Sequence, residues 1–228
     1  MKEWKEIPDI ELYSDGGAEP NPGKGGFGVI LTYKGRSKEF FQGYELTTNN
    51  RMELMGVIFG LEQLKTKAKV TVYSDSKYVV DGIVKGWAVN WERNNWIRKK
   101  GNLVLNKDLW ERLLDVIDKH EVTFNWVKGH AGHEENEHCD VLANQGINSE
   151  HKIKDEGYLE YLENIEYYQE QSIVNEGDSC RKCHTSVIKK TPKSKKAKQG
   201  QTYYFEYYLF CPTCKTMYFV EEAKREIP

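Results

Sequence analysis

The chain has 228 residues, of which 39% are hydrophobic and 30% charged, and this predicts one full domain with a packed core plus a small module. No stretch approaches the roughly 18 consecutive apolar residues of a membrane span. The N-terminus has neither the apolar segment nor the cleavage site of a secretory signal. These features exclude a membrane-spanning protein and lead us to expect a cytoplasmic one.

The net charge of −2 is unevenly distributed along the chain. Residues 1–150 carry 20 basic and 23 acidic side chains, residues 151–176 carry 2 and 7, and residues 177–228 carry 11 and 5. We interpret these stretches as a main domain, an acidic helical linker and a basic module. The excess of positive charge in the module indicates an anionic partner.

Strand-like and helix-like segments alternate through the main domain. Residues 10–14, 27–33 and 39–46 hold β-branched and aromatic residues between Gly, Pro and Asn turns, which predicts an antiparallel meander. Periodicity then predicts a helix at 50–65, a strand at 69–73, helices at 76–85 and 109–119, a strand at 122–127 and a helix at 136–148. The order βββαβααβα predicts an α/β fold with a mixed five-stranded sheet flanked by helices.

The C-terminal third has a different character. Apolar residues recur at roughly helical intervals in residues 151–176, which favours a helical linker. Residues 177–228 predict short strands around cysteines, interrupted by six lysines within residues 189–198. In most proteins such a lysine run is a solvated loop, and phosphate binding is the alternative.

Four acidic residues stand at positions where they can converge. Asp15 ends the apolar first strand and is followed by two glycines, where we expect a backbone turn and close approach by other groups. Asp75 follows the strand at 69–73, Glu53 lies in the first turns of a helix, and Asp140 lies in the last helix of the main domain. Taken singly, each acid has an ordinary interpretation as a turn or helix-terminal residue. Together they form a set of oxygen ligands suited to divalent cations.

The neighbours of these acids carry a family resemblance. Residues 13–17 (YSDGG), 21–26 (NPGKGG), 47–54 (TTNNRMEL), 73–79 (YSDSKYV) and 126–140 (WVKGHAGHEENEHCD) closely resemble bacterial-type ribonuclease H type 1. The five motifs occur in the family's order, and the predicted element order is that of the ribonuclease H-like fold. Only about eight residues precede the first predicted strand, so we do not expect the N-terminal hybrid-binding domain of eukaryotic members.

The resemblance implies a role for each matched residue. Asp15, Glu53, Asp75 and Asp140 correspond to the carboxylates that hold two Mg²⁺ ions, with Mn²⁺ as an alternative. His130, in a Gly-flanked loop, corresponds to the residue that assists proton transfer and product departure. The implied reaction is hydrolysis of the RNA strand of an RNA–DNA hybrid, leaving 5′-phosphate and 3′-hydroxyl ends.

The resemblance also implies the substrate contacts. Discrimination of RNA from DNA requires groups that touch the 2′-hydroxyl, and the matched positions here are Asn21, Thr48, Asn49, Asn50 and Asn136. Lys77 stands where the family commonly has Gln, which replaces a base contact by a phosphate contact.

A segment rich in tryptophan and cations follows the second predicted helix. Trp87 and Trp91 resemble part of the basic protrusion by which bacterial members grip the DNA strand, although the spacing from Asp75 is one residue longer here. Residues four apart on a helix also share one face, so packing of both tryptophans onto the core is the alternative.

Two Cys-x-x-Cys pairs lie in the basic module. Cys180 and Cys183 are separated by 27 residues from Cys211 and Cys214, and four thiolates from two such pairs make a tetrahedral zinc site. The module resembles a zinc ribbon, in which structural Zn²⁺ supplies much of the stability of a small core. A redox pair and ligation by His184 are the alternatives; Cys139 is left over.

These features together predict a ribonuclease H with an appended zinc module that assists nucleic-acid binding. The expected partner is an RNA–DNA hybrid duplex, bound by a monomer without a membrane, while a protein partner of the zinc module remains an alternative. Two other classes of function compete: a catalytically silent hybrid-binding protein, and a DNA-directed nuclease on the same fold. The complete set of acids with His130 favours an enzyme, and Asn21, Asn49 and Asn50 favour a hybrid substrate.

Overall fold

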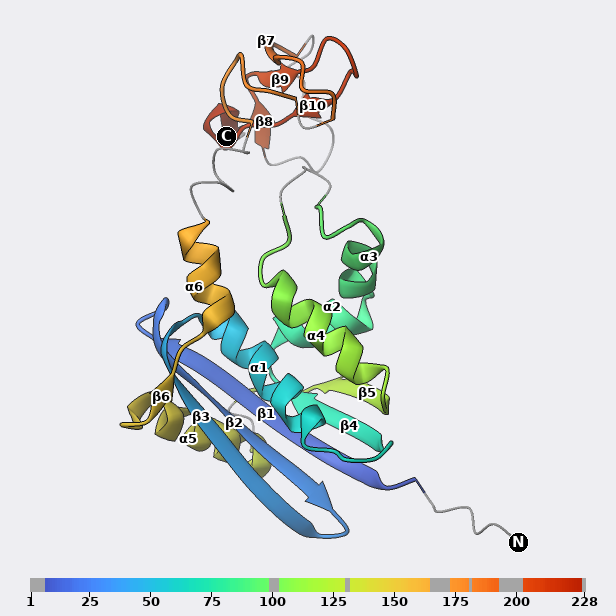
Figure 1. Ribbon diagram of the computed structural model, residues 1–228, viewed down its shortest axis with the longest axis vertical. Helices are drawn as coiled ribbons and strands as arrows, with labels where there is room; N and C mark the ends of the chain where they lie inside the picture. The colour runs from blue at the N-terminus through green and yellow to red at the C-terminus, as the bar shows by residue number, and fades with distance from the viewer. Residues whose placement is uncertain are drawn as a thin grey trace, which may run out of the picture. The chain divides into compact units, whose positions relative to one another are not determined.

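The computed structural model describes residues 7–98, 103–129, 132–164, 173–180, 182–192 and 203–226. The chain forms two compact units (Figure 1). The first comprises Met1–Trp96 and Val104–Leu162, and the second comprises Ile97–Leu103 and Glu163–Pro228. No described helix is both long enough and apolar enough to span a bilayer.

The first unit is built on one mixed sheet. Its strands are β1 (Asp9–Glu19), β2 (Gly23–Tyr33), β3 (Arg36–Thr47), β4 (Lys69–Ser74), β5 (Glu121–Trp126) and β6 (Lys152–Ile153), in the spatial order β5-β4-β1-β2-β3-β6. β1, β2 and β3 pair antiparallel, whereas β4 pairs parallel with both β1 and β5. The predicted mixed sheet is confirmed, with the two-residue strand β6 added beside β3.

Helices cover both faces of this sheet. They are α1 (Asn49–Glu62), α2 (Lys77–Val84), α3 (Trp87–Arg93), α4 (Lys107–Ile117), α5 (Glu134–Asn148) and α6 (Glu156–Glu163). Phe27 on β2 packs its ring against Phe59 of α1, whereas the neighbouring Gly28 faces α5. Because alternate residues of a strand point to opposite faces, α1 and α5 lie on opposite sides of the sheet, as Figure 1 shows. The predicted helices are confirmed, α6 lies within the stretch expected to be a helical linker, and α3 is additional.

The main core lies between the sheet and α1, α2 and α4. Its largest fully buried side chains include Trp110, Phe27, Leu12 and Met52. On the opposite face the layer of side chains between the sheet and α5 is thin, because Gly26 and Gly28 of β2 let the backbone of α5 lie directly against the strand. A Cβ on Gly28 would collide with the carbonyl oxygen of Cys139, so only glycine permits this approach.

Beyond the predicted main domain, the chain stays attached to the first unit. β6 extends the sheet, and Asp155 is only 3% exposed although it lies within the stretch expected to be a linker. The structure thus places residues 152–162 in the first unit rather than in a free connector. The reason is a buried ion pair that the sequence pattern does not reveal.

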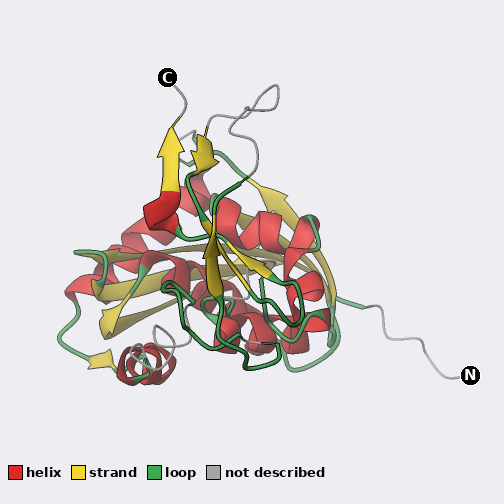
Figure 2. Ribbon diagram, turned by 90° about the horizontal axis from the view of Figure 1, so that it is seen from above, coloured by secondary structure: helices red, strands yellow, loops and turns green. Residues whose placement is uncertain are grey.

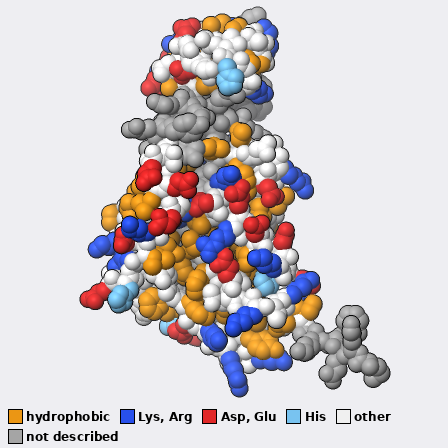
Figure 3. Space-filling model, viewed as in Figure 1, with side chains coloured by type: hydrophobic (Ala, Val, Ile, Leu, Met, Phe, Trp, Pro, Cys, Tyr) orange, Lys and Arg blue, Asp and Glu red, His pale blue; other side chains and the backbone are white. Residues whose placement is uncertain are grey.

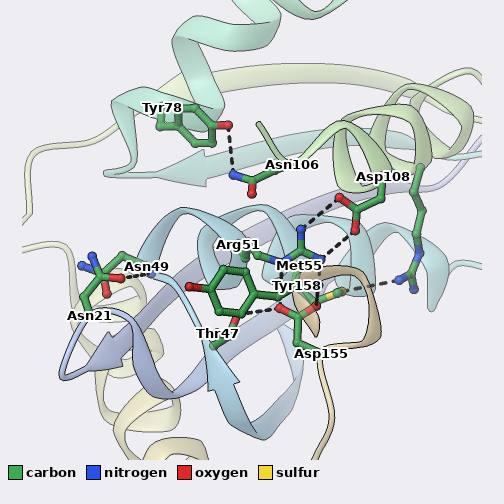
Figure 4. A network of polar contacts seen from close by, with 11 residues as sticks. Asn21, Thr47, Asn49, Arg51, Met55, Tyr78, Asn106, Asp108, Asp155 and Tyr158 are labelled. Carbon is green, nitrogen blue, oxygen red and sulfur yellow. Dashed lines mark hydrogen bonds and ion pairs between the residues drawn. The ribbon is translucent and has the colours of Figure 1, made fainter. Parts of the chain in front are cut away.

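Arg51 on α1 forms the centre of that ion pair (Figure 4). Its Nε and Nη2 donate to the two carboxylate oxygens of Asp155, each over 2.7 Å, while Nη1 and Nη2 donate to Asp108 of α4. The hydroxyl of Thr47 donates to Asp155 over 2.6 Å, and the backbone N–H of Tyr158 donates over 3.2 Å. One guanidinium therefore ties α1, α4 and the segment after β6 together.

The second unit has little regular structure (Figure 2). β7 (Ile188–Lys190), β9 (Tyr208–Phe210) and β10 (Met217–Tyr218) form a sheet in the order β10-β9-β7, and β8 (Tyr203–Phe205) pairs with β11 (Lys224–Glu226), which follows the short 3-10 helix η1 (Glu221–Ala223). A small core of Ile173, Val187, Leu209, Val220 and Ala223 packs around the cysteines. The predicted module of short strands is confirmed; residues 193–198 of the lysine run lie outside the described residues.

We predict that Asp155→Asn destabilises the first unit by roughly 3 kcal/mol, the usual effect of removing one partner of a buried ion pair. The variant leaves Arg51, whose side chain is 2% exposed, with a neutral partner. Urea unfolding followed by circular dichroism measures the change. Asp81→Asn is the matched control, because the exposed pair of Asp81 with Lys85 is expected to contribute less than about 1 kcal/mol. Equal effects of the two substitutions would contradict the prediction.

Candidate active site

The sheet register brings Asp15 and Asp75 to the same edge. β1 and β4 are adjacent and parallel, and their last paired residues are Tyr13 and Tyr73, whose rings stack with centroids 4.8 Å apart. Asp15 and Asp75 each come two residues later, so both carboxylates continue the side of the sheet on which the tyrosines lie. Asp15 does not stand at a turn as expected, because β1 continues to Glu19 in register with β2.

Two glycines next to Asp15 bring the helical acids to it. A Cβ on Gly16 would lie 2.5 Å from the backbone carbon of Met52, the residue before Glu53 on α1. Gly28, the cross-strand partner of Asp15, contacts Cys139, the residue before Asp140 on α5. Each close contact therefore sets a helix so that an acidic residue follows beside Asp15. Glycine is required at both positions by this approach of two backbones.

Neighbouring acids raise the pKa of Asp15 and of Glu53. Burial, followed by the charge of Asp75, raises the pKa of Asp15 from 3.8 to about 7, with smaller contributions from Asp140 and Glu53. Burial and Asp75 also raise the pKa of Glu53, against a hydrogen bond from Ser76 that lowers it. A half-buried group of carboxylates is a site that favours a bound positive charge.

Neighbouring polar groups orient these carboxylates. The backbone N–H of Gly16 donates to Asp15 over 2.7 Å, and the hydroxyl of Ser76 donates to Glu53 over 2.7 Å. Ser76 also caps α2 by accepting from the N–H of Val79, so Asp75 is not the cap. Asn144, one turn after Asp140, donates to its carboxylate over 3.0 Å. An open groove passes between Asp15 and Asp140.

Of the expected substrate-contacting residues, Asn49 lines this groove and Asn21 is hydrogen-bonded to Asn49. Asn49, at the start of α1, accepts a hydrogen bond from the N–H of Ala18 over 2.7 Å, and Asn21 accepts one from the N–H of Asn49 over 3.2 Å (Figure 4). Thr48 is the N-cap residue of α1 without a side-chain capping bond, and Asn50 is exposed. The Asn21 loop, the end of β1 and the start of α1 are thus held together by amide side chains.

The tryptophans differ in their surroundings. Trp91 packs on the buried Trp110 with ring centroids 5.6 Å apart, whereas Trp87 is 39% exposed. Lys77 lies with its Nζ 4.9 Å from the ring of Trp126, which is 46% exposed and donates from its indole N–H to the backbone oxygen of Asp75. Trp126 was not among the predicted site residues, although it opens the motif at 126–140.

Two predicted residues need separate comment. Asn136, predicted to contact the substrate, lies in the first turn of α5 with only 3% of its surface exposed. His130 lies outside the described residues. The loop that leads to it approaches Asp75, because a Cβ on Gly129 would lie 2.5 Å from an Asp75 carboxylate oxygen.

The four cysteines of the second unit form a compact cluster. The sulfurs of Cys180 and Cys214 are 3.4 Å apart and those of Cys183 and Cys211 are 3.3 Å apart. Of the residues that the structure describes, these four are the one group of three or more metal-ligand side chains whose ligand atoms all lie within 4.8 Å of one another. His184 is not in the group. The ligand atoms of the four acids of the first unit do not all lie this close together, and of these acids Asp15 and Asp140 line the groove.

The two cysteine pairs have the same local geometry. The N–H groups of His184 and Lys215 donate to the carbonyls of Cys180 and Cys211, and both residues have positive φ, 56° and 62°. Burial opposes ionisation of Cys180, but hydrogen bonds from Tyr218 and backbone N–H groups outweigh it and lower its pKa to about 6. Two equivalent turns that face each other with four thiols fit a small zinc ribbon.

Comparison with known proteins decides the family. The RNase H family profile matches residues 8–148, more than half of the chain. This chain belongs to the RNase H family. It is 56% identical over 137 residues to ribonuclease H of Desulforamulus reducens, and the aligned residues make up 60% of this chain and 86% of that relative. It is 48% identical over 151 residues to ribonuclease HI of Haemophilus influenzae, and the aligned residues make up 66% of this chain and 97% of that relative.

A solved RNase H structure supports the same conclusion. LC9-RNase H1, a type 1 RNase H with the type 2 active-site motif, is 28% identical, with a TM-score of 0.58 over 68% of this chain and 82% of that one. The family resemblance inferred from the sequence is confirmed. The RNase H profile ends at residue 148, so the cysteine cluster is an addition to the family's domain.

We predict that Asp15→Asn raises the melting temperature of the protein by a few degrees at pH 8 without added divalent cation. A carboxyl whose folded pKa is raised stabilises the protein fully below about pH 4 and loses that contribution as pH rises towards 7. The gain should therefore shrink at pH 5. Mg²⁺ should also remove it by stabilising the wild type. Thermal unfolding at both pH values tests this, with Asp81→Asn as control; an equal gain at pH 5 and pH 8 would exclude the charge effect.

Proposed function

We propose that this RNase H hydrolyses the RNA strand of RNA–DNA hybrids at the groove between Asp15 and Asp140. The observation that carries the proposal is the grouping of four acids, two of which, Asp15 and Glu53, have raised pKa values, in a chain that belongs to the RNase H family. Gly16 and Gly28 place Glu53 and Asp140 beside Asp15. Asp15, Glu53, Asp75 and Asp140 would hold two divalent cations, Mg²⁺ or Mn²⁺. When bound, such ions activate a water molecule and stabilise the leaving 3′ oxygen, which leaves 5′-phosphate and 3′-hydroxyl ends.

The protein's own groups prepare this site. The N–H of Gly16 and the hydroxyl of Ser76 fix the carboxylates of Asp15 and Glu53 by hydrogen bonds of 2.7 Å each. Asn144 orients Asp140. Held rigidly, these oxygens need little reorganisation when a cation and a phosphate arrive. We assign to His130 a proton-transfer role during product departure, from its loop next to Asp75.

Substrate recognition is assigned to the rim beside α1. Asn21, Thr48, Asn49 and Asn50 offer hydroxyl and amide groups that donate and accept, as contact with a 2′-hydroxyl requires. Lys77 with Trp126, and Trp87 on α3, would meet the DNA strand through charge and stacking. Asn136 is assigned a supporting role in shaping the loop before α5, since it is buried.

The charge distribution is consistent with this approach of the substrate. Figure 3 shows acidic and basic side chains interspersed over the face on which α6, α1 and α4 lie. Glu156 and Glu160 on α6 and Asp115 on α4 are exposed, and such carboxylates repel a phosphate backbone. The hybrid is therefore expected away from these acids, at the groove and at the exposed Lys77.

We predict that the protein with Mg²⁺ cuts only the RNA strand of labelled RNA–DNA duplexes, and not RNA–RNA or DNA–DNA duplexes. Asp15→Asn should lower cleavage on the order of a thousandfold by removing a metal ligand, while hybrid affinity is retained because repulsion of phosphates is reduced. Asp81→Asn, the same change on the outside of α2, should cut normally. Cleavage by Asp15→Asn at the wild-type rate would contradict the four-acid site, and cleavage of DNA–DNA duplexes would favour a DNA-directed nuclease.

For the second unit, we propose that Zn²⁺ bound by Cys180, Cys183, Cys211 and Cys214 stabilises a module that adds nucleic-acid affinity. The thiol cluster and the net charge of +6 in residues 177–228 support this. The core of the unit is small, so bound zinc would contribute much of its folding free energy.

We predict that truncation after Asn164 leaves a folded, active nuclease with weaker hybrid binding and a shallower slope of log K against log salt, by about 0.9 for each lost phosphate contact. Folding is expected because the H. influenzae relative consists almost entirely of the matched region. The cut must follow α6, since a cut after residue 150 removes Asp155 and leaves Arg51 without its buried partner. A zinc chelator added to the full chain should reproduce the loss. Equal slopes for both forms would show that the module binds something else, such as a protein.

A further inference from the structure

The outer face of the sheet β10-β9-β7 carries exposed aromatic and apolar side chains. Ile188, Phe210 and Met217 are direct cross-strand neighbours in one row. Tyr208 and Lys190 pair in the next row, beside Phe219. Ile188 is 38% exposed, Phe219 43% and Met217 53%. We call these six residues the aromatic face.

The aromatic face is distinct from the core of the second unit. Leu209 and Tyr218, which alternate with the residues of this face along β9 and β10, are 1% and 7% exposed and pack around the cysteines. The sheet therefore already buries one side. Its other side keeps large apolar groups in solvent, although a unit of this size gains stability from every ring it can bury.

Lysines accompany these rings. The Nζ of Lys190 lies 3.8 Å from the centre of the Phe210 ring, and that of Lys215 lies 5.8 Å from it. None of the strands β7, β9 and β10 contains an acidic residue. Aromatic rings with cations over them, on strands without a carboxylate, suit a ligand that combines flat apolar groups with negative charge.

We propose that the aromatic face binds unpaired nucleotides of a single-stranded nucleic acid. The bases of a duplex are already stacked within the helix, so only an unpaired strand can offer base faces to Phe219 and Phe210. The lysines then lie where the phosphates between successive bases run, and Lys190 leaves its ring when a base stacks there. This inference rests on the proposed role of the second unit and specifies its ligand as unpaired strand flanking the hybrid.

A protein partner is the alternative ligand of this face, and a nucleic-acid strand and a protein would require different properties of the Phe219 side chain. Base stacking requires a ring, whereas docking of an apolar peptide requires only apolar surface. Phe219 contacts Phe205 and Tyr208 at centroid distances of 4.9 and 6.2 Å, so substitution at its exposed edge can be made without emptying the core.

The test uses the full-length, zinc-loaded protein and fluorescently labelled 15-nucleotide strands of deoxythymidine and of uridine, measured by anisotropy. Phe219→Ala and Phe219→Leu should both weaken binding roughly fivefold or more, the usual effect of losing one base–aromatic stack, while Phe219→Trp should retain it. Phe41→Ala, at a ring that is 47% exposed on β3, is the matched control and should bind as the wild type. Zinc content and circular dichroism confirm that each variant is folded.

A charge variant tests the lysines independently. Lys190→Gln should lower the slope of log K against log salt by about 0.7, the contribution of one phosphate of a single strand. Lys65→Gln, at an exposed lysine of the first unit, should leave the slope unchanged. If deoxythymidine and uridine strands bind alike, stacking is the shared chemistry; a difference identifies which flanking strand the face takes.

Failure to bind either strand, or wild-type affinity in Phe219→Leu, would overturn the inference, the second result pointing to an apolar protein partner. Cleavage of a blunt RNA–DNA hybrid by the wild type reports on the proposed function alone. Hybrid cleavage without single-strand binding therefore rejects only the aromatic face, and single-strand binding without hybrid cleavage rejects only the nuclease.

Discussion

The approach of two helices to the sheet at Gly16 and Gly28 is the constraint on which the active site depends. Both glycines adjoin Asp15, one in sequence and one across the strand pair. Their missing side chains let α1 and α5 meet the sheet backbone at Met52 and Cys139. The next residues are Glu53 and Asp140, so one packing requirement positions acids from both faces of the sheet. Larger residues at these glycines would separate the acids as well as the layers.

Ionised acids so close together repel one another, in keeping with the raised pKa of Asp15, and the cations that we propose there would relieve this repulsion. Arg51 lies two residues before Glu53 and holds the start of α1 to α4 and to Asp155. A buried guanidinium with two carboxylates gives a fixed geometry rather than a large net stabilisation. Arg51 thereby holds α1 in place although Glu53 on the same helix lies near other negative charges. On this one helix, Arg51 stabilises the fold and Glu53 belongs to the proposed metal site.

The second unit is organised around its cysteines. Its two Cys-x-x-Cys turns repeat the same backbone hydrogen bond and the same positive φ, which indicates a fold organised around its thiols rather than around a large core. With one side of its sheet committed to the cysteines, the other side is available for contacts. If the aromatic face binds unpaired bases as we propose, this unit would add a single-strand contact to the duplex contact proposed for the groove of the first unit.

The sequence by itself determined the order of the main strands and helices, the family and the cysteine site, because periodicity and short motifs are local properties. It misjudged what depends on distant partners. Gly16 and Gly17 suggested a turn, but pairing with β2 keeps them in a strand. Residues 151–176 predict an acidic helical linker, but residues 152–162 belong to the first unit, where Asp155 bonds to Arg51, 104 residues earlier in the chain. The sequence pattern does not reveal that Trp126 donates to the backbone of Asp75 or that Asn136 is buried, because which side of an element meets solvent is set by neighbouring elements. The tertiary structure alone decided these points, since burial and ion pairing arise only when segments far apart in the chain come together.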